Sequence, residues 1–220
     1  DLLLEDKFKE TQSRLTDKGL PKGIIVLLHG ATGTGKTEIV KQLAIYSDRE
    51  IMKVEISQSK SMWYGESEKI IKRIFTDYKE FAKQTPILLF NEADAILSKR
   101  NDAGNSSISQ TENAIQNILL EEFENFEGIL IATTNMANHL DSAFERRFLY
   151  KVKFQKPSIN IRSKIWKQKL PLLNENECQL LAEKFDFSGG QIDNIIRKNE
   201  IQEIVHGTMT NYENVLSFCK

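Results

Sequence analysis

GATGTGKT, at residues 30–37, lies between the apolar run 24–28 and the helix-like run 37–46. It matches the pattern G-x-x-x-x-G-K-[ST] at every fixed position. Its three glycines let the backbone turn tightly and aim successive N–H groups inward, which makes an anion nest at the start of a helix. The pattern is typical of a loop that binds the phosphates of a nucleoside triphosphate.

The residues of this loop have distinct predicted roles. Lys36 is long enough to reach the β- and γ-phosphates of a bound nucleotide. Thr37 supplies a hydroxyl to Mg²⁺, an ion that keeps most of its waters and binds through a few oxygens and the phosphates. The predicted nucleotide-binding residues here are Gly30, Ala31, Thr32, Gly33, Thr34, Gly35, Lys36, Thr37 and Glu38.

The composition excludes several classes of function. The 220 residues carry 30 Lys and Arg against 31 Asp and Glu, and this balance disfavours nucleic acid and anionic membrane surfaces as partners. No apolar run is long enough to span a bilayer. Cys178 and Cys219 have no metal-like spacing, which indicates a reducing, cytoplasmic location. Because Asp1 stands where an initiator Met would, we expect a longer parent chain.

Strand-like and helix-like runs alternate as far as residue 156, which predicts a parallel sheet with helices on both faces. The stretch 99–109 is polar and contains glycine, and we expect a mobile loop there. The expected strands are 24–28, 52–56, 87–90, 129–132 and 149–154, and the expected helices are 2–15, 37–46, about 66–83, about 110–126 and 141–147.

A change of pattern at Pro157 indicates a domain boundary. After it the sequence predicts helices at 159–170, 175–185, 190–205 and 212–218, with no strand. The predicted domains are a linker helix at 1–18, a large α/β nucleotide-binding domain at 19–156 and a small helical domain at 157–220. A helical domain of this size needs a neighbour or a ligand for its stability.

Polar side chains follow the third and fourth predicted strands, at the edge where open α/β sheets bind ligands. Asn91 and Glu92 end the third strand, and Asn135 follows the fourth. Glu92 is a candidate base for an attacking water, while an amide at position 135 is able to hold that water or the γ-phosphate. Arg146 and Arg147 lie far along the chain from the phosphate loop, which suits delivery to a neighbouring subunit's γ-phosphate.

Several motifs together resemble an AAA+ ATPase module from about residue 19 onward. They are GATGTGKT, ILLFNEAD at 87–94, ATTN at 132–135 and LDSAFERRF at 140–148, followed by a helical segment. SMWYGESEK at 61–69 is similar to the pore loop and next helix of the AAA clade, which includes vacuolar-sorting, katanin-like and segregase ATPases.

The resemblance implies a P-loop NTPase fold, with a five-stranded parallel sheet between helices and a small C-terminal helical lid. It also implies a ring, usually a homo-hexamer, that binds ATP between subunits and pulls a protein substrate through a central pore. The residue roles it implies are Walker A for Lys36 and Thr37, Walker B for Glu92, sensor 1 for Asn135, arginine fingers for Arg146 and Arg147, pore loop for Trp63, Tyr64 and Gly65, and base contacts for Gly189 and Gly190.

Asn91 departs from the family pattern, which has aspartate before the Walker B glutamate. An amide accepts a hydrogen bond from Thr37 or from a Mg²⁺-bound water but brings no negative charge. We therefore expect Thr37 and Asn91 to form a weaker Mg²⁺ site and hydrolysis to be slower. The leading hypothesis is an ATP-hydrolysing ring motor that remodels proteins. The alternatives are an ATP-gated scaffold with little hydrolysis and, disfavoured by the charge balance, a DNA-dependent AAA+ protein.

Overall fold

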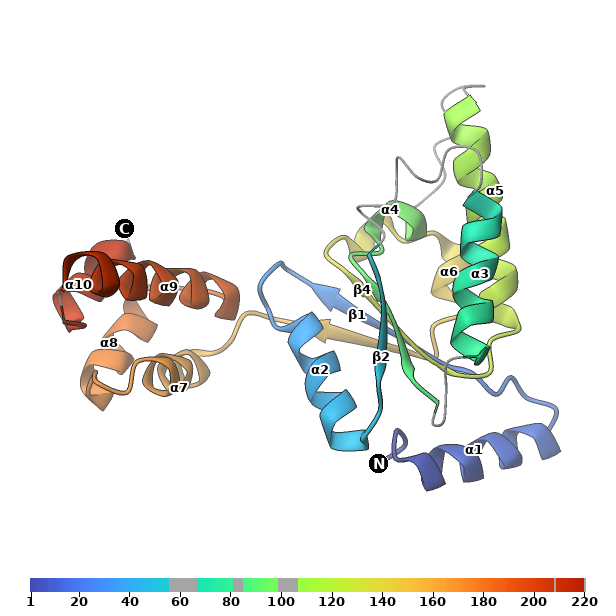
Figure 1. The fold of residues 1–220 in the computed structure, drawn as a ribbon, viewed down its shortest axis with the longest axis horizontal. Coiled ribbons are helices and arrows are strands. Elements are labelled where there is room, and N and C mark those ends of the chain that lie inside the picture. Colours follow the sequence, from blue (N-terminus) through green and yellow to red (C-terminus); the bar gives the residue numbers. More distant parts are fainter. Residues whose placement is uncertain (56–66, 81–84, 99–106, 208, 220) are drawn as a thin grey trace. The chain divides into compact units, whose positions relative to one another are not determined.

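The computed structural model describes residues 1–55, 67–80, 85–98, 107–207 and 209–219. They divide into two compact units, one made of 1–30 with 36–153 and the other of 31–35 with 154–220 (Figure 1). The predicted pore loop at Trp63, Tyr64 and Gly65 lies outside the described residues, and so do positions 99–106 of the predicted mobile loop.

A five-stranded parallel sheet forms the centre of the first unit, as the sequence predicts, in the order β2-β3-β4-β1-β5. Every residue of β4 is buried, and only the last residue of β3 is not, which explains why both read as unbroken apolar runs. The strands are β1 (Ile24–Gly30), β2 (Ile51–Glu55), β3 (Ile87–Asn91), β4 (Ile129–Thr134) and β5 (Tyr150–Phe154).

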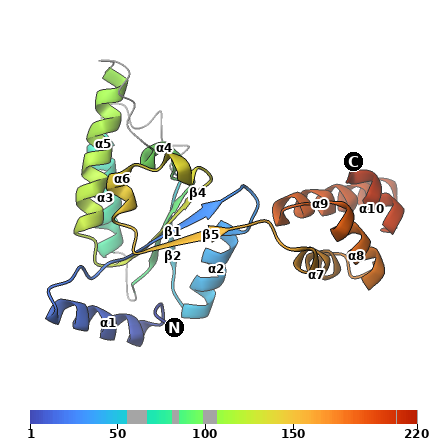
Figure 2. The same cartoon turned by 180° about the vertical axis from the view of Figure 1, so that it is seen from behind.

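Helices pack on both faces of the sheet (Figures 1 and 2). Phe75, Phe123 and Phe144 pack with Phe90 of β3 in the core beneath α3, α5 and α6, so the apolar spacing of these segments is confirmed. The helices are α1 (Glu5–Asp17), α2 (Lys36–Ser47), α3 (Ser67–Glu80), α4 (Asp94–Leu97), α5 (Ser107–Glu124), the 3₁₀ turn η2 (Ala137–His139) and α6 (Ser142–Glu145).

The second unit contains four described helices around Trp166, and the predicted helical segment is confirmed. A capping box starts two of them, with Asn174 and Ser188 as the cap residues. No helix among the described residues is long and apolar enough to cross a membrane. The four helices are α7 (Ile159–Lys169), α8 (Glu175–Lys184), α9 (Gly189–His206) and α10 (Tyr212–Phe218).

Tyr78 ties α3 to two strands of the sheet. Its buried hydroxyl donates to the Pro86 carbonyl (2.8 Å) and accepts the Ile129 N–H (3.1 Å). Burial raises the pKa of Tyr78 to about 12, so the phenol stays neutral. A Cβ at Gly128 would overlap this hydroxyl, which explains the glycine before β4.

Tyr78→Phe is expected to lower the free energy of unfolding by about 1–3 kcal/mol, because the change removes one partner from each of two buried backbone groups. Urea denaturation followed by circular dichroism measures the change. Tyr46→Phe is the matched control, since its exposed hydroxyl contacts only the Asp1 carboxylate at 3.3 Å among the described residues. Equal stabilities of the two variants would contradict the role given to Tyr78.

Candidate functional site

Lys36 is largely buried at the start of α2, with 8% of its surface exposed. Its ammonium donates to the Gly30 carbonyl and to Asn135 Oδ1, both at 2.8 Å. Burial lowers the pKa of Lys36, and the carboxylates of Asp94 and Glu92 oppose that effect. The first unit therefore brings together a cation and an amide that the chain separates by 99 positions.

Asn91, the last residue of β3, lies at the same edge of the sheet and accepts two hydrogen bonds. The Thr37 hydroxyl donates to Asn91 Oδ1 at 2.9 Å, and the hydroxyl of buried Thr133 donates to the same atom at 3.3 Å. Thr37 and Asn91 thus present adjacent hydroxyl and amide oxygens, which are hard donors of the kind that Mg²⁺ takes directly or through water. These two residues fit the ion that the sequence predicts.

Glu92 has a left-handed backbone with φ of 52°. This region is uncommon for residues other than glycine and costs about 1–2 kcal/mol. Thr133 holds the turn, because its hydroxyl accepts the Glu92 N–H at 3.0 Å and its carbonyl accepts the Ala93 N–H at 2.9 Å. The Glu92 side chain is exposed at the end of β3. Sparsely populated backbone of this kind is concentrated at functional sites.

Asp94 organises the turn that carries Asn135, a role that sequence reasoning missed. Its Oδ1 accepts the backbone N–H groups of Asn135 and Met136, each at 3.0 Å, and also accepts the Thr134 hydroxyl. One carboxylate after β3 therefore fixes the end of β4. One feature of the sequence could have indicated this role: Asp94 is an acidic residue just beyond a predicted parallel strand, at the edge of the sheet where Asn135 was expected.

The loop 31–35 belongs to the second unit, where it contacts the start of α9. The Gly190 N–H donates to the Gly33 carbonyl at 2.9 Å. Gly33 has φ of 76°, and a Cβ there would lie 2.7 Å from Ser188 Oγ. A Cβ on Gly190 would lie 3.0 Å from the Gly33 Cα, so this approach requires glycine on both sides.

The other predicted loop residues lie at the surface or bond locally. Ala31 and Thr32 are exposed, and the Thr34 hydroxyl donates to the Ala31 carbonyl at 2.8 Å. Gly35 has φ of 93°. Glu38, in the first turn of α2, accepts a hydrogen bond from Gln42 and pairs with Lys41, both on its own helix.

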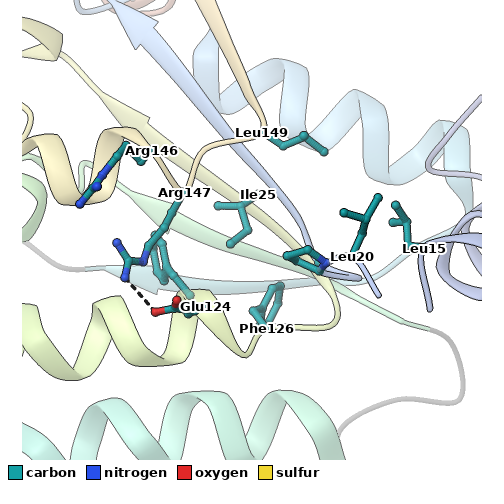
Figure 3. Close-up of a pocket in the computed structure, with 11 residues that line it drawn as sticks. Leu15, Leu20, Ile25, Glu124, Phe126, Arg146, Arg147 and Leu149 are labelled. Atoms are coloured by element: carbon teal, nitrogen blue, oxygen red, sulfur yellow. Dashed lines mark hydrogen bonds and ion pairs between the residues drawn. The ribbon is translucent and has the colours of Figure 1, made fainter. Parts of the chain in front are cut away.

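Arg146 and Arg147 differ in their surroundings (Figure 3). The Arg147 guanidinium donates to the Leu120 carbonyl (3.1 Å), to the Ala143 carbonyl (2.8 Å) and to the Glu124 carboxylate (2.9 Å), which joins α6 to α5. Arg146 is exposed, and its guanidinium has no hydrogen bond or ion pair within the described part of the chain. Both line a pocket whose walls include Leu15, Leu20, Ile25, Phe126 and Leu149.

Comparisons with known proteins identify the family of the chain. The model of the ATPase family associated with various cellular activities (AAA) matches residues 26–156. CdcH of Halobacterium salinarum is 31% identical over 201 residues, and Fidgetin-like protein 1 of Drosophila melanogaster is 32% identical over 184 residues. The Katanin p60 ATPase-containing subunit A1 of Strongylocentrotus purpuratus is 28% identical over 187 residues.

These matches cover 87%, 80% and 78% of the present chain but only 26%, 34% and 35% of the three relatives. Among solved structures, the FIGL-1 AAA domain in complex with ADP aligns with a TM-score of 0.72 at 21% identity. That alignment covers 98% of this chain and 76% of the other, so the same fold extends over both units.

Proposed function

The chain belongs to the ATPase family associated with various cellular activities, and on that premise we propose that it binds ATP with Mg²⁺ and hydrolyses it to drive the remodelling of a protein substrate. The observation that carries the proposal is the hydrogen-bonded edge of the sheet, where Lys36 meets Asn135 and Thr37 meets Asn91. The two hydrogen bonds hold a cation, a hydroxyl and two amides together at one edge of the sheet, and these are groups that bind a triphosphate and its Mg²⁺.

Binding uses the loop amides and Lys36 on the phosphates. Thr37 and Asn91 hold Mg²⁺, which neutralises charge on the β- and γ-phosphate oxygens when it is bound. The Thr37 proton goes to Asn91 Oδ1, and this leaves the hydroxyl lone pairs available. Gly189 and Gly190, at the start of α9, are proposed to contact the base.

Hydrolysis needs a base and a polar group that orient water in line with the γ-phosphate. We assign the base to Glu92, whose strained backbone is held by Thr133. Asn135 positions the water or the γ-phosphate, and Asp94 fixes its backbone from the neighbouring strand.

The trans arginine is Arg146 in this proposal. Its guanidinium is exposed and has no partner among the described residues, whereas Arg147 is held by α5 and α6. A finger for a neighbouring subunit must be free to reach an external phosphate. Activity then requires assembly, and we propose a ring, with a hexamer as the expected form.

The substrate is proposed to be a polypeptide gripped by the pore loop at Trp63, Tyr64 and Gly65. Relatives named katanin, fidgetin-like and cell division cycle protein 48 homolog support a protein-directed role. A cytoplasmic location is supported by the free thiols of Cys178 and Cys219. The competing function is an ATP-gated scaffold, and the neutral amide of Asn91 is the observation in its favour.

The rate of ATP hydrolysis per protomer is expected to rise with protein concentration and then to level off, because an arginine acting in trans makes turnover depend on assembly. A phosphate-release assay in Mg²⁺ over a wide concentration range measures this, with Lys36→Ala as the control that loses nucleotide binding. A rate per protomer that is independent of concentration would contradict shared sites. Confirmed ATP binding with no turnover at any concentration would favour the scaffold.

A further inference from the structure

Arg162 of α7 is a buried cation that joins three segments of the second unit. Its guanidinium donates to the Pro157 carbonyl at 2.8 Å, just before α7, and to the Ala182 carbonyl at 3.1 Å, in α8. It also forms an ion pair of 2.6 Å with the carboxylate of Asp186, and only 7% of the Arg162 side chain is exposed. A buried charge needs such partners, so Asp186 is paired with a cation that the surrounding helices fix in place.

Asp186 lies in the connection 185–188 between α8 and α9, the α9 entry loop. It has a second cationic partner, because Lys156 donates to both its carboxylate and its carbonyl, each at 2.9 Å. The rings of Phe185 and Phe187 stack with their centroids 5.1 Å apart and pack against the helical core of the unit. The α9 entry loop is therefore held by two ion pairs at Asp186 and by apolar contacts on either side of it.

The α9 entry loop leads directly into the contact with the phosphate loop. Ser188 is buried and caps α9, since its Oγ accepts the Gln191 N–H at 3.3 Å and its own N–H donates to Gln191 Oε1 at 2.9 Å. Two residues further on, the Gly190 N–H donates to the Gly33 carbonyl at 2.9 Å. Because this contact leaves no room for a Cβ on either glycine, a shift of the α9 entry loop must move the phosphate loop or break the hydrogen bond.

We propose that Asp186 is a positioning residue for nucleotide binding, whose ion pairs hold the α9 entry loop so that Gly190 meets Gly33 in the phosphate loop. The inference rests on the proposed binding of ATP by residues 31–35 and by Gly189 and Gly190. A phosphate loop that already has its binding geometry reduces the entropy that is lost when the nucleotide binds. Asp186 acts through the loop and not on the reacting atoms, so its removal should weaken binding and leave the hydrolysis step unchanged.

The decisive experiment compares Asp186→Ala with Asp193→Ala in equilibrium binding of a fluorescent ATP analogue. Asp193 is the matched control, because its ion pair with Lys169 also joins α9 to α7 but lies beyond the start of the helix. The two carboxylate side chains are similarly exposed, at 68% for Asp186 and 55% for Asp193. Asp186→Ala is expected to raise the dissociation constant about fivefold, and Asp193→Ala to leave it unchanged.

Hydrolysis and metal dependence separate positioning from catalysis. At saturating ATP, Asp186→Ala should retain the original turnover rate within about twofold while KM rises. The loss of affinity should be equal in Mg²⁺ and in EDTA, because the phosphate loop contacts ATP without the metal. An unchanged dissociation constant in Asp186→Ala, an equal loss in Asp193→Ala, or a loss confined to Mg²⁺ would each overturn the proposal.

Asp186→Asn tests the same role with a smaller change. Its amide oxygen still accepts from Arg162, but the NH₂ group cannot accept from Lys156, so its affinity should fall between those of the original protein and Asp186→Ala. This variant takes the place of Asp186→Ala in the comparison if circular dichroism shows that the alanine variant is unfolded. Affinity equal to that of the original protein in Asp186→Asn, with the alanine variant unfolded, would assign Asp186 to stability alone.

A second readout needs no nucleotide. In the ¹⁵N-labelled protein the Gly190 amide should exchange faster with water in Asp186→Ala, because its hydrogen bond to the Gly33 carbonyl is formed less of the time. Asp193→Ala should leave this exchange rate as it is. If the original protein does not bind the ATP analogue, the proposed function fails, while the exchange rate of Gly190 still decides whether Asp186 positions the phosphate loop.

Discussion

Replacement of Glu92 by glutamine should abolish ATP hydrolysis while ATP binding stays intact. Glutamine has the size of glutamate and preserves the backbone hydrogen bond to Thr133, since that bond involves only the main chain of residue 92. It cannot accept a proton from water, and loss of a general base costs about 10²–10⁴-fold in rate. The phosphate contacts proposed for Lys36 and the loop do not depend on the carboxylate.

The measurement pairs a steady-state hydrolysis assay with equilibrium binding of a fluorescent ATP analogue in Mg²⁺. Glu50→Gln is the matched control, because Glu50 is exposed and precedes β2, at the opposite end of the strands from Glu92. We expect that control to hydrolyse ATP at the original rate. Equal activity in Glu92→Gln would refute the assigned role.

Replacement of Arg146 by alanine should lower the hydrolysis rate about 10³-fold with little change in ATP affinity or stability, because a trans arginine acts on transition-state charge at a neighbour's site. Arg147→Ala should instead destabilise the protein by about 1–3 kcal/mol, since it leaves the Leu120 and Ala143 carbonyls without this donor. Hydrolysis assays and urea denaturation of both variants separate the two roles.

Mixing inactive variants gives a sharper test of action in trans. Glu92→Gln retains Arg146 but lacks the base, and Arg146→Ala retains the base but lacks the finger. A mixture should recover part of the activity, because an Arg146 from one protein completes the Glu92 site of the other. A mixture of Glu92→Gln with the double variant should stay inactive. No recovery in the first mixture, with co-assembly demonstrated, would contradict the trans assignment.

The long helices were predictable because burial of one face gives a period that is visible in the sequence, and β3 and β4 were predictable as unbroken apolar runs. The edge strands and the buried β3 and β4 lie within a few residues of their expected bounds. The four-residue helix α4 and the turn η2 were missed, because one turn is too short to show a 3.6-residue period; α6 is equally short and was expected as part of a longer helix at 141–147. Asp94, the first residue of α4, accepts the backbone N–H groups of Asn135 and Met136, which follow β4 and precede η2.

The sequence predicts the residues of the candidate site and one contact among them, from the Thr37 hydroxyl to Asn91, but not the other contacts. Lys36, Asn91 and Asn135 follow from the motif and from strand ends. The role of Asp94 depends on which strands are neighbours and in what register, and periodicity does not reveal strand order. The difference between Arg146 and Arg147 likewise comes from packing against α5. Arg147 contacts Glu124 and Leu120 of that helix, which lie 23 and 27 positions earlier in the chain.

The left-handed backbone at Glu92 also predicts how the sequence changes over evolutionary time. Folding alone favours glycine or asparagine there, since both adopt positive φ at lower cost. With the catalytic role proposed for Glu92, selection for turnover would have to hold glutamate against a steady mutational advantage in stability. On the proposed function, position 92 should be among the first to change in a duplicated copy that has lost hydrolysis, and a glycine or asparagine there would mark such lineages.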